Sequence, residues 1–246
     1  MDFTDGGNGL MGAYAGPDVV ENGLVLALDA GNTRSYPGSG TTWNDLSGHG
    51  YGGSLVGATT YSTSPSRFDT NATLITEQNH LSTSSEITLA DASEYTWDFY
   101  VKLRSSAQAT FHSLLGRINN NTNPWLSLYA DNTSGTSWYI RYRQSSGTYT
   151  NGTSITDYNI QNNWANITLS VNSSRNVNIY LNGVFRETLN PVSTLFYVGR
   201  IAGGYGSGGN FYSFQGSIAS FKMYNRALTA SEIRQNFNAL RGRFGI

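Results

Sequence analysis

The sequence predicts a single all-β domain, an antiparallel sandwich that is closed by one short C-terminal helix. Three observations support this fold class. Aromatic residues make up 13% of the 246 residues, and they suit pleated, half-buried sheet surfaces. Several runs alternate between apolar and polar residues, as strands with one buried face do. The end of the chain changes to a helical spacing that begins with a capping motif.

The first half of the chain contains several stretches that are typical of strands. Residues 23–31 form a short apolar run, and residues 32–53, rich in turn residues, are expected to be a long loop. Residues 124–144 predict a strand, a turn and a second strand. Residues 95–103 (YTWDFYVKL) alternate with a period of two and predict a half-buried strand, whose apolar face carries Trp97, Phe99, Val101 and Leu103.

The clearest hairpin signal lies in residues 164–188. Two alternating runs flank the turn NSSRN, and Asn182-Gly183 follows, a dipeptide preferred in type I′ turns because both central residues need a positive φ. We therefore expect an antiparallel meander of three strands. Further strands are expected at 194–200 and 216–224, joined by a glycine-rich loop.

The start of the C-terminal helix, expected at about residues 230–240, is strongly marked. Thr229 and Glu232 have the spacing of a capping box with Thr229 as the N-cap. Leu228 and Ile233 are placed to form the hydrophobic staple that accompanies it. We expect this helix to act as a latch on the sandwich rather than to carry catalytic residues.

The rest of the helix and the chain boundaries follow from simpler signals. Gly242 is expected to end the helix, and Arg226 to bind nearby carbonyls at the turn into it. The apolar stripe of the helix consists of Ile233, Phe237 and Leu240.

Residues 1–20 are glycine-rich and are expected to be an N-terminal arm or linker, or a disordered terminus, so that the domain spans residues 21–246.

Four blocks of the sequence carry a family resemblance: residues 24–55, 95–103, 164–184 and 216–245. Together they resemble laminin-G-like domains of the concanavalin A-like lectin/glucanase superfamily. The first and fourth, with the RGRFG ending, look most like versions in structural proteins of tailed bacteriophages. The resemblance implies a concanavalin A-like jelly-roll sandwich of two antiparallel sheets with loops at one rim. It does not fix a ligand, because this fold hosts lectins, glycosidases, adhesion modules and scaffolds. Residues 104–160 match the family less well.

The composition excludes several classes of partner. The formal net charge is −1 and no basic run occurs, which argues against binding to nucleic acid. No stretch approaches about 18 apolar residues, so membrane insertion is not expected. The N-terminal residues lack the basic start and apolar run of a Sec signal peptide, and there are no cysteines. These features agree with assembly in the host cytoplasm and a location in the virion, as the resemblance implies.

The sequence does not predict an enzyme. Glycoside hydrolysis needs two carboxylates about 5 to 10 Å apart, which the superfamily's glucanases carry on one strand face. The nearest cluster here is Glu86, Asp91 and Glu94, while Asp98 stands alone on its strand. No nucleophile motif occurs, and the three histidines stand apart along the chain at His49, His80 and His112.

Calcium is the one ion that the resemblance implies. Laminin-G-like domains often hold it at the rim, through the oxygen ligands that this hard cation prefers. Asp29, Asn32 and Asp45 lie in or near the loop at 32–53 and are the candidate ligands. The alternative is structural, because a short Asp in such a loop commonly forms an Asx-turn.

Aromatic side chains in or beside loops are candidates for stacking on a sugar ring. Packing in the core or rim is the alternative for each, and Tyr205, flanked by glycines, is the least expected in the core. The glycan candidates are Trp125, Trp138, Tyr205 and Tyr212. The core is expected to contain Trp43, Trp97 and Trp164.

The sequence-based hypothesis is a non-enzymatic virion structural protein, either a capsid decoration or a tail-associated lectin-like module. Its expected partners are capsid or tail proteins, bound through the N-terminal arm, and cell-surface polysaccharide. A homotrimer is an expectation from the family alone. The alternatives are a stand-alone carbohydrate-binding or adhesion module and a glycoside hydrolase of the same fold. The identity of the glycan and the position on a particle remain open.

Overall fold

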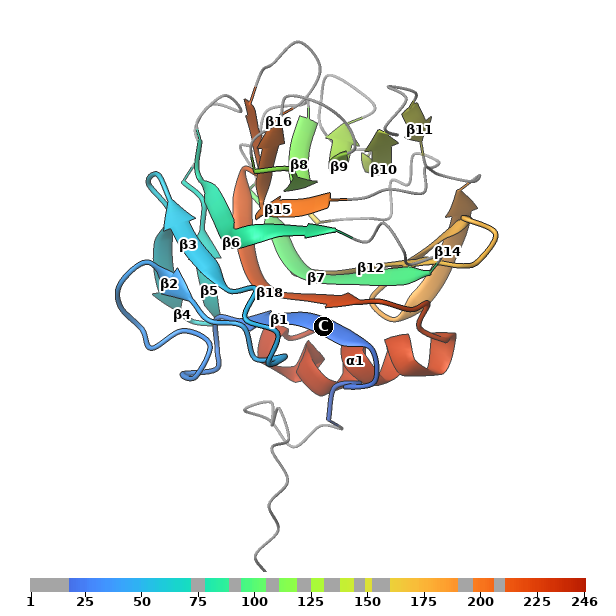
Figure 1. The fold of residues 1–246 in the computed structure, drawn as a ribbon, viewed down its shortest axis with the longest axis horizontal. Helices are drawn as coiled ribbons and strands as arrows, with labels where there is room; N and C mark the ends of the chain where they lie inside the picture. The colour runs from blue at the N-terminus through green and yellow to red at the C-terminus, as the bar shows by residue number, and fades with distance from the viewer. Residues whose placement is uncertain are drawn as a thin grey trace, which may run out of the picture.

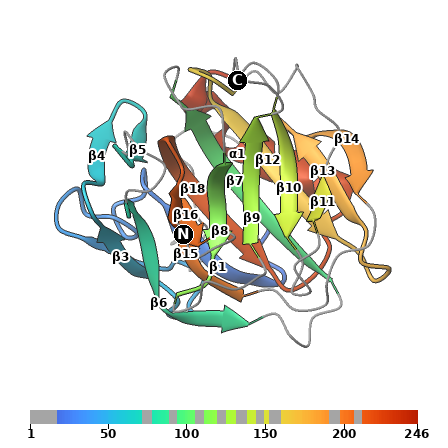
Figure 2. The same ribbon diagram turned by 90° about the horizontal axis from the view of Figure 1, so that it is seen from above.

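The computed structural model describes residues 18–71, 78–88, 94–104, 111–118, 125–130, 138–143, 149–151, 160–189, 197–205 and 211–246. In this part of the chain, two eight-stranded antiparallel sheets pack face to face and enclose the main core. Figures 1 and 2 show the two layers from the side and from above. The expected all-β, concanavalin A-like sandwich with one C-terminal helix is therefore confirmed.

The first sheet, sheet A, contains the central strands β7 and β18. Its order is β14-β13-β12-β7-β18-β5-β4, and β1 pairs with β18 beside this path. The strands of sheet A are β1 (Leu24–Asp29), β4 (Thr60–Thr63), β5 (Ser66–Asp69), β7 (Tyr95–Leu103), β12 (Ala165–Val171), β13 (Val177–Leu181), β14 (Val184–Leu189) and β18 (Gly216–Tyr224).

The second sheet, sheet B, has the order β11-β10-β9-β8-β15-β6-β3-β2. A short ribbon of β16 (Gly203–Tyr205) and β17 (Phe211–Ser213) follows β15. The strands of sheet B are β2 (Thr42–Trp43), β3 (Gly53–Val56), β6 (His80–Thr88), β8 (Phe111–Gly116), β9 (Trp125–Ala130), β10 (Trp138–Arg143), β11 (Tyr149–Asn151) and β15 (Tyr197–Ile201).

The predicted meander lies in sheet A as β12, β13 and β14. Asn182 and Gly183 form the tight turn between β13 and β14 with φ values of 52° and 71°, as a type I′ turn requires. The expected strands at 95–103 and 216–224 are β7 and β18, which pair with each other at the centre of the sheet. The three tryptophans expected in the core, Trp43, Trp97 and Trp164, are all buried.

One expected loop contains a strand, and one long strand was missed. The segment 32–53 is not one uninterrupted loop, because Thr42 and Trp43 form β2 and pair with the start of β3. The nine-residue strand β6 was not predicted at all. Its sequence, HLSTSSEIT, is mostly polar, and its pairing with β15 is interrupted by a bulge, so it has no sustained alternation.

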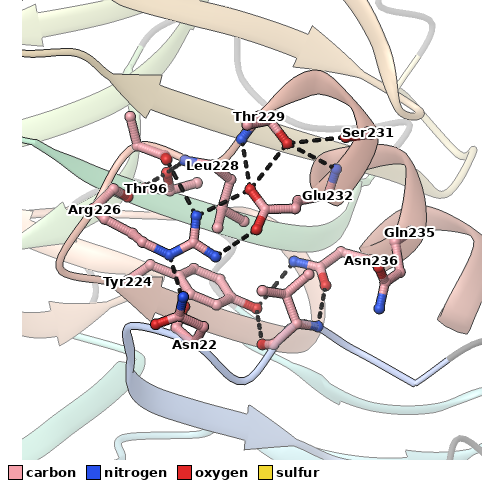
Figure 3. A network of polar contacts seen from close by, with 12 residues as sticks. Asn22, Thr96, Tyr224, Arg226, Leu228, Thr229, Ser231, Glu232, Gln235 and Asn236 are labelled. Atoms are coloured by element: carbon pink, nitrogen blue, oxygen red, sulfur yellow. Dashed lines mark hydrogen bonds and ion pairs between the residues drawn. The ribbon is translucent and has the colours of Figure 1, made fainter.

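Helix α1 (Ala230–Phe244) begins as predicted. The Thr229 hydroxyl accepts a hydrogen bond from the backbone N–H of Glu232, and the Glu232 carboxylate accepts one from the N–H of Thr229. Figure 3 shows this capping box together with Arg226, whose guanidinium binds both carboxylate oxygens of Glu232 at 2.6 and 2.9 Å and also the carbonyl of Asn22 at 2.9 Å. Arg226 therefore has the structural role expected for it.

The helix ends later than predicted. Gly242 lies within α1, and Gly245 is the left-handed C-cap with a φ of 67°. The extra turn is stabilised by packing, because the ring of Phe244 lies 4.7 Å from the rings of both Tyr100 and Trp164. Arg243 also forms an ion pair with Asp29 at 2.6 Å.

Helix α1 covers the face of sheet A that points away from sheet B, as Figure 1 shows. The chain just before β1 lies under the helix as well. Val19 and Val20 are buried there, and the N–H of Val20 donates to Asn236 Oδ1 at 2.8 Å. The packed part of the chain thus includes residues before 21, whereas residues 1–17 of the expected arm lie outside the described residues.

Candidate functional site

The outer face of sheet B carries a row of polar side chains across four adjacent strands. Thr42 on β2 lies opposite Ser54 on β3, Ser54 opposite Ser82 on β6, and Ser82 opposite Arg200 on β15. Residues directly opposite in paired strands point to the same face. The next row, on the other face of the sheet, runs through Leu55, Leu81, Ile201 and Leu115, which pack in the core.

A shallow trough of about 500 Å³ lies along this face, with Thr42, Ser54 and Ser82 in its walls. We refer to these three residues as the hydroxyl row. Within the described chain their hydroxyls make no hydrogen bond, so they are available to a ligand. The backbone at Gly53 forms part of the wall, and a Cβ atom there would come within 2.1 Å of the Ser82 carbonyl oxygen. Glycine therefore allows β3 and β6 to approach closely under the trough.

Asp45 organises the loop at one end of the trough. Its Oδ1 accepts hydrogen bonds from the N–H groups of Ala27 at 2.9 Å and Ser47 at 2.8 Å. Its Oδ2 accepts from the Ser47 hydroxyl at 2.7 Å and from the N–H of Tyr51 at 3.2 Å. A carboxylate has about four acceptor positions, so the protein itself uses all of them.

Arg200 continues the row beyond Ser82. Its guanidinium lies 4.8 Å from the ring centroid of Tyr205, and its Nη1 donates to the carbonyl of Arg117. Its Nε is buried without a hydrogen-bond partner in the described structure. Burial lowers the pKa of the Arg200 guanidinium, although Tyr205 and Glu86 oppose this effect.

The charged side chains near Arg200 bind each other. Arg117 binds both oxygens of Glu86, at 2.9 and 3.2 Å, and its guanidinium lies 4.0 Å from the ring centroid of Tyr197. His80 is buried, and burial together with Arg200 lowers its pKa to about 4, so it is neutral at pH 7.

The structure places the four predicted glycan residues differently. Tyr205 is half-buried and stacks beside Arg200, whereas Tyr212 is half-buried on the other face of the β16–β17 ribbon, because Tyr205 pairs with Phe211 and Tyr212 with Gly204. Trp138 is only 1% exposed and packs against His112, so it cannot stack on a sugar from solvent. Trp125 begins β9, and its side chain lies outside the described part of the structure.

The three predicted calcium ligands all accept hydrogen bonds from donors of the protein itself. Besides Asp45, Asp29 Oδ1 accepts hydrogen bonds from the N–H of Gly31 and from Arg243, and Asn32 Oδ1 caps the N–H of Arg34 in an Asx-turn. A calcium ion would have to displace these donors. Among the described residues, no group of three or more His, Cys, Asp or Glu side chains is arranged to hold a metal.

A second cleft, of about 650 Å³, lies beside the same loop and is lined by Glu21, Arg34 and His49, among others. None of the predicted glycan residues lies in its walls. Arg200 and Tyr205 do not line the trough on sheet B either, but its wall residue Ser82 lies directly opposite Arg200. The described helix is also too short and too polar to cross a membrane.

Sequence reasoning missed Arg200 and the hydroxyl row. Each residue has an ordinary local context, and only the register of four strands brings the row together. The alternation of Thr42 with Trp43 and of Ser54 with Leu55 was the available signal, but it predicts only which residues point away from the core.

Comparisons with known proteins agree with this architecture. The chain resembles a binding domain of botulinum neurotoxin DC in complex with SialylT (TM-score 0.63, 14% identity), a botulinum neurotoxin type C structure linked to cell entry through two ganglioside molecules (0.60, 14%) and the binding domain of Paraclostridial Mosquitocidal Protein 1 (0.60, 17%). Each similarity covers 89% of this chain but 52% of the other, so the chain spans about half the length of these structures. At such identities the likeness shows the fold alone.

Of the two sequence comparisons, one found a match. No curated protein sequence matches the chain. The family model of the concanavalin A-like lectin/glucanases superfamily matches residues 75–234, which is more than half of the 246 residues. The chain therefore belongs to the concanavalin A-like lectin/glucanase superfamily.

Proposed function

We propose that the protein is a non-enzymatic, lectin-like module that binds glycans in the trough on the outer face of sheet B. The observation that carries the proposal is the hydroxyl row, three neighbouring hydroxyls in an open trough without partners among the described residues. Sugar hydroxyls are recognised by such donors and acceptors, arranged in a shallow, preformed site. The ganglioside and SialylT links of two similar toxin structures support this class of ligand.

The non-enzymatic part of the proposal rests on the carboxylates near the trough. Hydrolysis of a glycosidic bond needs one carboxyl group that donates a proton and a second that attacks or activates water. Asp45 is the acidic residue in the described walls, and its oxygens hold four protein donors. Glu86, on β6, is bound by Arg117 and by the N–H of Ile118.

A glycan array followed by calorimetric titration of the best glycans tests this function. Ser54 is exposed in the middle of the row, so Ser54→Tyr fills the trough with a residue that strands tolerate well. We expect this variant to lose at least about tenfold in affinity, equivalent to about 1.4 kcal/mol. Thr188→Tyr, on the exposed strand β14, is the matched control and should bind like the wild type.

The outcome that contradicts the proposal is equally clear. If no glycan binds, or if Ser54→Tyr binds as tightly as Thr188→Tyr while both remain folded, the trough is not a glycan site. Thermal unfolding of each variant separates lost binding from lost folding.

The biological context we propose is a virion, as a capsid decoration or tail-associated protein. The support is the resemblance of residues 24–55 and 216–245 to structural proteins of tailed phages. Mass spectrometry of purified particles should detect the protein, and its absence would refute this context. A deletion of residues 1–17 tests the proposed arm without removing Val19 and Val20, which are buried under α1.

A further inference from the structure

Arg200 differs from the other arginines and lysines that lie close to an acidic group in the described chain. Ion pairs are formed by Arg67, Arg117, Lys222, Arg226 and Arg243, each with its own carboxylate. Among the described residues, Arg200 has no such partner. Glu86, the acidic residue nearby, is bound by Arg117 at two oxygens and by the N–H of Ile118 at 3.1 Å.

The charge of Arg200 is also partly removed from water. The guanidinium lies 4.8 Å from the ring centroid of Tyr205 and 5.7 Å from that of Phe211, and its buried Nε has no partner in the described structure. A partly desolvated cation without a counter-charge is unfavourable, and an anion bound beside it would offset that cost. The charges of Arg117 and Glu86 cancel, and His80 is neutral. Arg200 and these three residues together therefore carry one net positive charge at pH 7.

The guanidinium is held in a fixed position before any ligand arrives. Nη1 donates to the Arg117 carbonyl, and the ring of Tyr205 restricts the plane of the group. Fixing the side chain in advance lowers the entropic cost of binding. Because Nη1 is bound to this carbonyl and Nε is buried, Nη2 is the nitrogen left to donate to an oxygen of a carboxylate or a sulfate.

Arg200 lies directly opposite Ser82, the last residue of the hydroxyl row. A ligand that fills the trough and reaches Arg200 therefore meets neutral hydroxyls first and a cation at the end. We propose that the trough selects acidic glycans, whose sugars carry a carboxylate or a sulfate group, and that Arg200 binds this group. The inference rests on the glycan-binding function proposed above and adds the class of sugar.

Matched pairs of oligosaccharides test the inference. β-1,4-Mannuronan and β-1,4-mannan oligosaccharides differ in the carboxylate, while κ-carrageenan oligosaccharides and their desulfated forms differ in the sulfate. We expect the wild type to bind the acidic member of at least one pair at least about tenfold more tightly, and the pair that responds identifies the anion.

Variants assign this preference to Arg200. Arg200→Gln should reduce binding of the acidic oligosaccharide to about that of its neutral partner. Arg200→Lys, which keeps the charge, should retain part of the preference. Arg186→Gln, an exposed arginine on β14, removes the same charge far from the trough and should change neither affinity.

The results separate the two proposals. If neutral and acidic oligosaccharides bind equally, or if Arg200→Gln and Arg186→Gln behave alike, the selection of acidic sugars by Arg200 is wrong and the glycan-binding function stands. If none of these oligosaccharides and no glycan on the array binds the wild type, the proposed function itself fails.

Discussion

The outer faces of both sheets carry polar side chains, but the surroundings of these side chains differ. On sheet A, the central side chains Thr96, Asp98 and Lys222 are buried, and helix α1 lies over that face. On sheet B, Thr42 and Ser54 are exposed and Ser82 is half-buried along an open trough.

The polar groups of sheet A are bound to one another and to the covering segment. Asp98 Oδ2 lies 3.2 Å from Lys222 Nζ, and Asp98 Oδ1 accepts a hydrogen bond from Thr168 at 2.9 Å. Thr96 binds the carbonyl of Arg226 and the N–H of Leu228, which leads into α1. Polar groups that satisfy one another stabilise the fold, whereas the hydroxyl row makes no such bonds within the described chain, which is why we propose it as the glycan site. Substitutions on sheet A should therefore change stability, and substitutions on sheet B should change binding.

The largest expected effect follows from breaking the buried ion pair of sheet A. In Lys222→Met the side chain keeps much of its length, but the carboxylate of Asp98, which is fully buried, loses its counter-charge. Removing one partner of a buried pair typically costs about 3–5 kcal/mol. Urea denaturation should show this loss in the free energy of unfolding, and any variant protein that remains folded should bind glycans normally.

The double variant Asp98→Asn with Lys222→Met is the control for this effect. It removes both charges, and the amide that replaces the carboxylate retains hydrogen-bonding capacity towards Asn166 and Thr168, which bind Asp98 in the native protein. We expect it to be more stable than Lys222→Met alone. Equal loss in the single and double variants would mean that the ion pair is not what makes this face sensitive.

A smaller effect is expected at the start of the covering helix. Hydrogen bonds from Arg226, supported by the N–H and hydroxyl of Thr229, lower the pKa of Glu232 to about 2 against an ordinary value of 4.5. A lowered pKa means that this stabilisation is present above pH 4.5 and is lost as the pH falls towards 2. Glu232→Gln should cost roughly 1 kcal/mol at pH 7, as the loss of a helix cap does.

The pH dependence provides the sharper test of Glu232. Stability curves of the wild type and Glu232→Gln should converge between pH 4.5 and pH 2, because protonation removes the ion pair from the wild type too. Glu21→Gln, an exposed residue outside this network, should keep the wild-type slope. Parallel curves for the wild type and Glu232→Gln would argue against the role of the Arg226 contact.

The sequence predicted features that depend on neighbouring residues. The start of α1 was found because Thr229 and Glu232 are three residues apart, and the turn at Asn182-Gly183 because both residues tolerate a positive φ. The alternation in β7 likewise identified the core face. It placed Asp98 correctly on the opposite face, but a period of two does not reveal whether another element covers that face.

The features that the sequence did not predict depend on contacts between distant residues. Trp138 follows residues that are typical of a turn, yet the pairing of β10 with β9 in sheet B places its ring against His112 in the core. Arg200 gains its significance from the pairing of β15 with β6 and from the Tyr205 ring that follows. No local spacing encodes either arrangement.

The smallest expected effect concerns the end of the helix and separates the sequence prediction from the structure. If Gly242 were the C-cap, its φ would be positive and Ala would be strained there, so Gly242→Ala would destabilise the protein. In the structure Gly242 is an exposed residue inside α1, and Gly245 has the positive φ. Gly242→Ala should then raise the free energy of unfolding by about 0.5–1 kcal/mol, since Ala is the better helix former. Because α1 covers sheet A and not the trough, this gain in stability should leave glycan affinity unchanged. A loss of stability would mean that the helix ends at Gly242 and that the packing of Phe244 on Tyr100 does not extend it.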